Sequence, residues 1–318
     1  MSMSLSINPT YYCNFRCDFC YLTPEQLGDR QKVNLSKLRS RLSEVSKAVE
    51  ISHIDLYGGE VGLLKPDYFY AMKDVIRQYY QGEININTNL SAFPDFFRDD
   101  DIYLSVSYDF HAREKEQFVL NNMMNANKPL AVLILASPEV LKMDVDYMIG
   151  VMNMVSNVES VEIKPYSTNQ ANQHNVTHKD FEDFVIKWLE NPNKNFHFEN
   201  EWRIKDSLNG EYNAFSDNHV YINPRGNFSV LEFDSMDNEF FLELPTFNDY
   251  IKWTYKEKKE NVSDICRKCD YFGKCLTEHY RYVADLKNSC NGYKGLLDYA
   301  RMESAKQGVS LNEQRVYG

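Results

Sequence analysis

The chain has 318 residues, no apolar run long enough to cross a membrane, and a start that lacks the charged-then-apolar build of a signal peptide. It carries 35 Lys and Arg against 46 Asp and Glu, a formal net charge of −11, and it has no basic stripe for contacts to phosphate. We therefore expect a cytoplasmic protein whose partners include neither a membrane nor a nucleic acid.

The seven cysteines fall into two clusters, the first of which is Cys13, Cys17 and Cys20. In a reducing compartment such clusters bind metal more often than they form disulfides. Three closely spaced thiolates can hold three corners of a four-iron four-sulfur (4Fe-4S) cluster and leave one iron open for chemistry. The alternative is a structural zinc site, but zinc commonly takes four ligands in spaced pairs, and no fourth ligand lies nearby.

Strands and helices alternate along the first half of the chain. Residues 4–12 read as a buried strand, so the first cysteines follow its carboxyl end. Further strands are predicted at 51–57, 82–89, 101–109, 130–136 and 158–165, and helices at 36–50, 66–80, 145–155 and 177–190. This alternation indicates an α/β fold with a parallel sheet, in which ligands bind at the carboxyl ends of the strands.

Glycines and polar residues stand at the ends of the predicted strands. Gly58 and Gly59 let the backbone approach a ligand closely, and the Glu60 carboxylate can accept a hydrogen bond from a cation. The next two strand ends and the residues after them add Asn89, Ser107, Asp109, His111 and Arg113. Because the carboxyl ends of parallel strands share one edge of the sheet, we expect these groups on the same rim as the cysteines.

The spacing of the first cluster, with Phe19 as the aromatic residue before the last cysteine, resembles the signature of radical S-adenosylmethionine (SAM) enzymes. The resemblance implies a partial, open (β/α)6 barrel. It also implies that SAM binds the open iron and, with an electron that a donor such as flavodoxin or ferredoxin supplies, is cleaved to a 5'-deoxyadenosyl radical. The implied SAM contacts are Phe19, Gly58, Gly59, Glu60, Asn89, Ser107, Asp109 and, as a partner for the SAM carboxylate, Arg113.

The second cluster contains Cys266, Cys269, Cys275 and Cys290, which can close fully around one metal centre. On spacing alone, a zinc site and an iron-sulfur cluster both fit. A β-hairpin is predicted before this cluster at residues 219–231, and a helix at 246–260.

In a radical SAM chain this pattern resembles the C-terminal extension called SPASM, or its shorter relative called twitch. The resemblance implies a barrel over residues 1–215, followed over residues 216–318 by a small α+β domain with one auxiliary 4Fe-4S cluster. The predicted hairpin has no cysteine for a further cluster. His279 stands where SPASM has a fourth cysteine, either as an alternative ligand or as a relic.

Three ligands plus four use all seven thiols, so no cysteine is left to donate a hydrogen atom to a substrate radical. This favours an oxidative reaction, in which the substrate radical attacks a partner and then loses a proton and an electron. Candidate bases for the proton are His111, Glu232, Asp234 and His279. We therefore expect an enzyme that modifies a ribosomally made peptide, with an intramolecular cross-link as the favoured product.

Two other functions stay open. One is a twitch-type radical SAM dehydrogenase or cofactor-biosynthesis enzyme that acts on a small molecule. The other is a zinc-binding scaffold protein with two zinc sites. We expect no separate peptide-binding domain before the first strand, so a peptide leader would bind the barrel rim or another protein.

Overall fold

The computed structural model describes residues 2–166, 171, 174, 176–215, 217–231, 241–255, 260, 262–276, 290 and 292–307. Its strands form one sheet in the order β10-β9-β8-β1-β2-β3-β4-β5-β6-β7. The strands are β1 (Ser2–Ile7), β2 (Glu50–Leu56), β3 (Ile84–Thr88), β4 (Ile102–Ser107), β5 (Leu130–Ala136), β6 (Val158–Pro165), β7 (His197–Phe198), β8 (His219–Ile222), β9 (Phe228–Leu231) and β10 (Phe241–Leu244). All pairs from β8 through β1 to β7 are parallel, whereas β8, β9 and β10 pair antiparallel.

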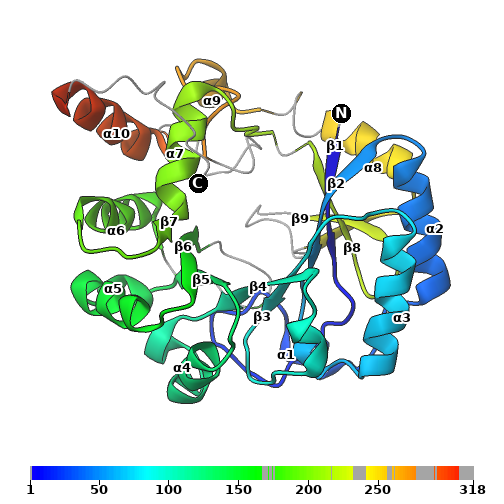
Figure 1. Ribbon diagram of the computed structural model, residues 1–318. Helices are drawn as coiled ribbons and strands as arrows, with labels where there is room; N and C mark the ends of the chain where they lie inside the picture. The colour runs from blue at the N-terminus through cyan, green and yellow to red at the C-terminus, as the bar shows by residue number, and fades with distance from the viewer. Residues whose placement is uncertain are drawn as a thin grey trace.

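Helices cover the outer side of this sheet. The α-helices are α1 (Pro24–Gly28), α2 (Leu35–Ser46), α3 (Pro66–Arg77), α4 (Glu116–Met124), α5 (Val145–Met154), α6 (His178–Glu190), α7 (Glu199–Asn209), α8 (Phe247–Trp253), α9 (Asp264–Arg267) and α10 (Lys294–Gln307). Short 3-10 turns are η1 (Val61–Leu63), η2 (Asp95–Arg98), η3 (Phe110–Ala112) and η4 (Val140–Lys142). Figure 1 shows the strands curving around an open interior, with α2 to α6 outside. None of the helices in the described part of the chain combines the length and apolar character of a membrane span.

The predicted α/β fold with a curved parallel sheet is confirmed. Strands β5 and β6 have the predicted bounds: β5 is an apolar run, and β6 ends at Pro165. The first strand is shorter than predicted and ends at Ile7. Thr177 caps α6 through a reciprocal capping box with Asp180, which fixes where that helix begins.

The predicted hairpin is present as β8 and β9. Its turn contains Gly226, whose φ of 76° is the left-handed conformation that glycine adopts without strain. Strand β8 pairs with β1 in parallel, with Ser4 opposite His219, so the hairpin extends the barrel sheet. The sheet therefore continues past residue 215, and the division into two domains stays a prediction.

Helix α7 is not among the helices that the sequence pattern predicts. Its buried residues are Asn200, Ile204 and Ser207, two of which are polar, so no apolar stripe marks it. The Asn200 side chain accepts a hydrogen bond from the Ile163 N–H at 2.7 Å and donates one to the Ile163 carbonyl at 2.9 Å. These two bonds attach α7 to β6.

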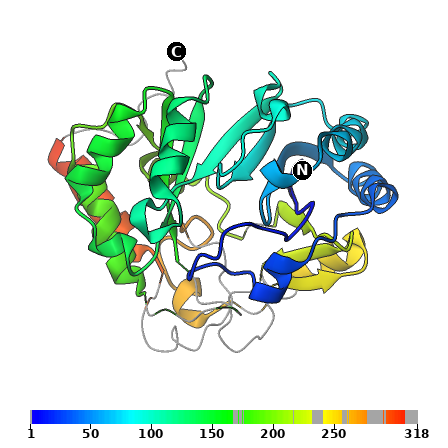
Figure 2. The same ribbon diagram turned by 90° about the horizontal axis from the view of Figure 1, so that it is seen from below.

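Helix α10 is attached to α6 by a buried carboxylate. Glu182 of α6 is 7% exposed and accepts a hydrogen bond from the Leu296 N–H at 3.0 Å in the first turn of α10. A Cβ at Gly295 would lie 2.5 Å from a Glu182 oxygen, so this contact requires glycine. Figure 2 shows α7 and α10 on the side of the molecule opposite α2, with the turn around α9 between them.

We expect Glu182→Ala to lower the free energy of unfolding by about 1–2 kcal/mol, because the helix N-terminus loses its side-chain partner. Urea unfolding monitored by circular dichroism would measure the change. The matched control is Asp183→Ala, which removes an exposed carboxylate whose partner is Lys179. An exposed pair of this kind contributes about 0.5 kcal/mol, so equal effects of the two substitutions would contradict the role of Glu182.

Candidate functional site

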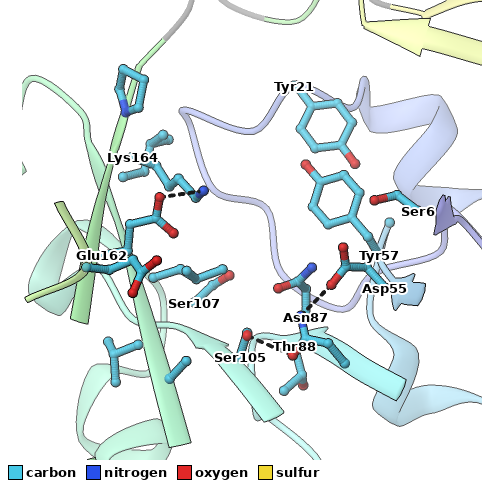
Figure 3. Close-up of a pocket in the computed structure, with 18 of the residues that line it drawn as sticks. Ser6, Tyr21, Asp55, Tyr57, Asn87, Thr88, Ser105, Ser107, Glu162 and Lys164 are labelled. Atoms are coloured by element: carbon cyan, nitrogen blue, oxygen red, sulfur yellow. Dashed lines mark hydrogen bonds and ion pairs between the residues drawn. The ribbon is translucent and has the colours of Figure 1, made fainter. Parts of the chain in front are cut away.

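A cavity of about 890 Å³ occupies the interior of the sheet. Figure 3 shows Glu162 and Lys164 of β6 on one wall, and Asp55, Tyr57 and Tyr21 on the other. Between them lie Asn87, Ser105 and Ser107 at the ends of β3 and β4. Parallel barrels with eight strands usually fill this space with branched apolar side chains, whereas here polar groups surround an open volume.

The loop with the first cysteines lies directly on the end of β2. The Gly59 N–H donates to the Thr10 carbonyl at 3.0 Å, and the Glu60 N–H donates to the Tyr12 carbonyl at 2.8 Å. A Cβ at Gly58 would lie 2.6 Å from the Thr10 oxygen, and one at Gly59 would lie 2.2 Å from the Tyr12 oxygen. The two glycines therefore allow the cysteine loop and the turn after β2 to make contact.

The three thiols of Cys13, Cys17 and Cys20 line the cavity and interact electrostatically with one another. Burial raises the pKa of each thiol, to about 12 for Cys17, where the nearby Arg113 acts in the opposite direction. Thiols bind metal as thiolates, so cluster binding here would release protons. Among the described residues, no three His, Cys, Asp or Glu side chains are arranged to hold a single metal ion. Each cysteine of this set would instead bind its own iron of a 4Fe-4S cluster.

Arg113 connects Asp109 with the cysteine loop. Its Nε donates to Asp109 Oδ2 at 2.7 Å, its Nη1 lies 3.6 Å from the Cys17 sulfur, and its guanidinium stacks 5.3 Å from the centre of the Phe19 ring. Asp109 is fully buried and also accepts a bond from the Leu135 N–H. Phe19, Asp109 and Arg113 all line the cavity, as do the other predicted SAM contacts Gly58, Gly59, Asn89 and Ser107.

Glu60 differs from the other predicted SAM contacts, because it is not among the residues that line the cavity. It is fully buried, and its carboxylate accepts hydrogen bonds from the Gly62 N–H at 2.7 Å, the Thr88 hydroxyl at 2.6 Å and the Asn89 N–H at 2.6 Å. Burial raises the Glu60 pKa, and these bonds oppose the shift. In this structure Glu60 attaches the end of β3 to the end of β2.

Asn89 is positioned by that contact and reaches the first cysteine. Its side-chain amide donates to the Asn14 oxygen at 3.2 Å and lies 3.5 Å from the Cys13 sulfur. Its own oxygen accepts a bond from the Ser91 N–H at 2.8 Å. Asn89 thus contacts a predicted cluster ligand as well as the cavity.

Of the predicted bases, His111 lies in the described part of the chain. It is exposed on η3 and does not line the cavity, because the turn after Asp109 points the imidazole outward. Glu232, Asp234 and His279 lie outside the described residues.

The cavity also contains ionisable residues that were not predicted as site residues from the sequence. On β6, one Glu162 oxygen contacts Lys164 Nζ and Arg203 Nε, both at 2.8 Å, and these cations hold the Glu162 pKa below its usual value despite burial. On β2, His53 and Asp55 form a second pair. The two strand residues of each pair stand two positions apart, and such residues share one face of a sheet. This spacing could have identified both pairs from the sequence.

The second cysteine set also comes together. Burial raises the Cys266 pKa to about 11, and the thiols of Cys290, Cys275 and Cys269 add to the effect. The sulfurs of Cys290 and Cys275 both lie within 4 Å of where a side chain on Gly292 would begin. The Ser207 hydroxyl on α7 donates to the Lys274 carbonyl and so attaches this turn to the barrel. The donor set is that of a four-cysteine cluster site.

We expect Glu60→Gln to lower the free energy of unfolding by about 1–3 kcal/mol, because an amide cannot accept all three bonds and leaves buried donors without a partner. Denaturant unfolding would measure this loss. Glu50→Gln is the control, since Glu50 begins β2, the strand that precedes Glu60, but is exposed. If the two substitutions lower the free energy of unfolding by equally small amounts, the Glu60 contacts do not stabilise the connection between the strand ends.

No protein-family model matches the chain, and no curated protein matches its sequence. Solved structures match it over most of its length. anSMEcpe with bound AdoMet (SAM) is 14% identical with a TM-score of 0.70, and the match covers 98% of this chain and 100% of that one. anSMEcpe with bound AdoMet and Cp18Cys peptide is 14% identical with a TM-score of 0.68, covering 96% and 99%.

SuiB of Streptococcus suis, bound to its precursor peptide SuiA, is a further match. It is 13% identical with a TM-score of 0.57, and the match covers 89% of this chain and 75% of SuiB. At these identities the likeness concerns the fold. The chain has the fold of these SAM-binding proteins, and the radical SAM fold that its first cysteine motif implies is confirmed.

Proposed function

We propose that this chain is a radical SAM enzyme that modifies a ribosomally made peptide. The observation that carries the proposal is the convergence of the Cys13, Cys17 and Cys20 thiols on the wall of one large cavity. When bound there, a 4Fe-4S cluster and SAM would supply a 5'-deoxyadenosyl radical for abstraction of a hydrogen atom from the substrate. The residues that would contact SAM are Phe19, Gly58, Gly59, Asn89, Ser107, Asp109 and Arg113, with Glu60 holding the strand ends beneath them.

The solved structures with the same fold support a peptide as the substrate. Two proteins of the same fold, anSMEcpe and SuiB, bind peptides, one of them a precursor peptide. We assign a peptide of that class to this chain.

The second cysteine set supports an auxiliary 4Fe-4S cluster on Cys266, Cys269, Cys275 and Cys290. Four thiolates leave no iron open, so this site is assigned to electron transfer or structure instead of substrate binding. An electron donor such as flavodoxin or ferredoxin is the partner that SAM cleavage requires. The favoured product is an intramolecular cross-link, because that reaction needs no thiol as a hydrogen donor.

Anaerobic reconstitution with iron and sulfide tests the proposal. We expect about eight irons per chain, as for two four-iron clusters. With SAM, a reductant and a short peptide encoded beside the gene, we expect 5'-deoxyadenosine and a peptide lighter by two hydrogens in mass spectrometry. Bound zinc without iron would favour the scaffold function, and deoxyadenosine formed only with a small metabolite would favour the small-molecule enzyme.

The combined variant Cys13→Ala, Cys17→Ala and Cys20→Ala separates the two metal sites. We expect it to bind about four irons, the content of one remaining cluster, and to form no 5'-deoxyadenosine, because the SAM-binding cluster has lost all its ligands. Iron analysis and chromatography of the reaction measure both effects. Retained SAM cleavage would contradict the assignment of these cysteines.

Cys290→Ala tests the auxiliary site. We expect SAM cleavage within about twofold of the unsubstituted protein but no modified peptide, because only the second metal site loses a ligand. The control is Lys268→Ala, an exposed residue between Cys266 and Cys269. Unchanged product formation in Cys290→Ala would remove Cys290 from the proposed chemistry.

A further inference from the structure

A row of hydrogen-bonded polar side chains crosses the inner face of β2, β3 and β4. His53 Nε2 lies 3.0 Å from Asp55 Oδ1, the Asn85 amide donates to the same oxygen at 2.6 Å, and the Ser105 hydroxyl donates to the Asn85 oxygen at 2.9 Å. All four residues line the cavity that also contains the cysteine thiols. Ile54 and Leu56, on the other face of β2, are buried under the helices.

The contacts of this row fix the orientation of the imidazole. Asp55 is an acceptor, so the His53 nitrogen that contacts it carries the hydrogen, and the neutral ring has Nδ1 as its acceptor. No described residue forms a hydrogen bond to Nδ1, and the His53 side chain is 45% exposed within the cavity wall. The Asp55 side chain is only 17% exposed and is held on two sides. A carboxylate that orients a histidine in this way is the arrangement found where histidine acts as a general base.

His53 is a better proton acceptor than Asp55. The hydrogen bond that His53 donates to Asp55 raises the His53 pKa above its usual 6.5, although burial opposes it. Burial raises the Asp55 pKa, but the contacts with His53 and Asn85 outweigh it and hold that pKa below 3.8. The other titratable groups near the pair are His219 of β8 and Tyr80 after α3. The charges of β6 lie across the cavity (Figure 3).

We propose that His53, oriented by Asp55, is the catalytic base that takes a proton from the oxidised substrate. This inference rests on the proposed function. One hydrogen leaves the peptide as an atom, which forms 5'-deoxyadenosine. After the carbon radical bonds to its partner atom, the second hydrogen leaves as a proton to His53 Nδ1, and the electron goes to a one-electron acceptor of the iron-sulfur class. The peptide thus loses two hydrogens and gains one bond.

His53→Gln tests the proposal in the reconstituted full chain, with the peptide encoded beside the gene as the probe. A general base contributes about 10²- to 10⁴-fold, so we expect SAM cleavage to continue while modified peptide per 5'-deoxyadenosine falls at least about 100-fold. The matched control is His197→Gln, an exposed histidine on β7 that does not line the cavity. Its ratio should equal that of the unsubstituted protein.

A second measurement separates a base from a merely structural histidine. The base must be neutral, so product per deoxyadenosine should rise with pH through a midpoint above 6.5, and Asp55→Asn should move that midpoint to lower pH. The NMR signal of the His53 ring is assigned by its absence in His53→Gln. In a titration without SAM or peptide, its midpoint should match the midpoint of product formation, both in the unsubstituted protein and in Asp55→Asn.

The outcomes separate this inference from the proposed function. If the unsubstituted protein cleaves SAM but no peptide loses mass, both are overturned. If it modifies the peptide and His53→Gln does so with the same ratio, only the role of His53 is overturned. A midpoint that Asp55→Asn leaves in place would likewise exclude Asp55 as the group that orients the base.

Discussion

The contact between the cysteine loop and the turn after β2 is the constraint on which the rest of the site depends. It exists because Gly58 and Gly59 have no side chains, since a Cβ on either would meet the carbonyl of Thr10 or Tyr12 at 2.6 Å or less. The loop then lies where the ends of β2 and β3 meet. The three thiols therefore face the same cavity as the polar ends of the strands.

Glu60 also stabilises this arrangement. Its buried carboxylate takes donors from the turn after β2 and from the end of β3, and burying a carboxylate is favourable only when it is paired in this way. The same contacts position Asn89, whose amide lies beside the Cys13 sulfur. Glu60, the last residue of the Gly-Gly-Glu motif, thus positions a side chain beside the cysteine loop through its contacts with the end of β3.

The sequence pattern predicted β1 to β6 because each of these strands places apolar residues in the core, such as the continuous apolar run of β5 and the buried Val158, Val161 and Ile163 of β6. It missed α7, whose contacts with β6 are made by the polar side chain of Asn200. Among the site residues, spacing identified the cysteines and Gly58, because local motifs encode them. The direction of the Glu60 and His111 side chains depends on tertiary contacts and on the turn at η3, which no local pattern specifies.

The placement of His53 and Asp55 shows a different limit of prediction from the sequence. Alternation along β2 placed them on one face, but only the curvature of the whole sheet makes that face the inside of the barrel. The same curvature brings β6 opposite, where Glu162 takes one of the three donors of Lys164. Under the proposed role of His53, a substrate that crosses the cavity would present the hydrogen it loses as a proton to Nδ1 on β2, opposite Glu162 and Lys164 of β6.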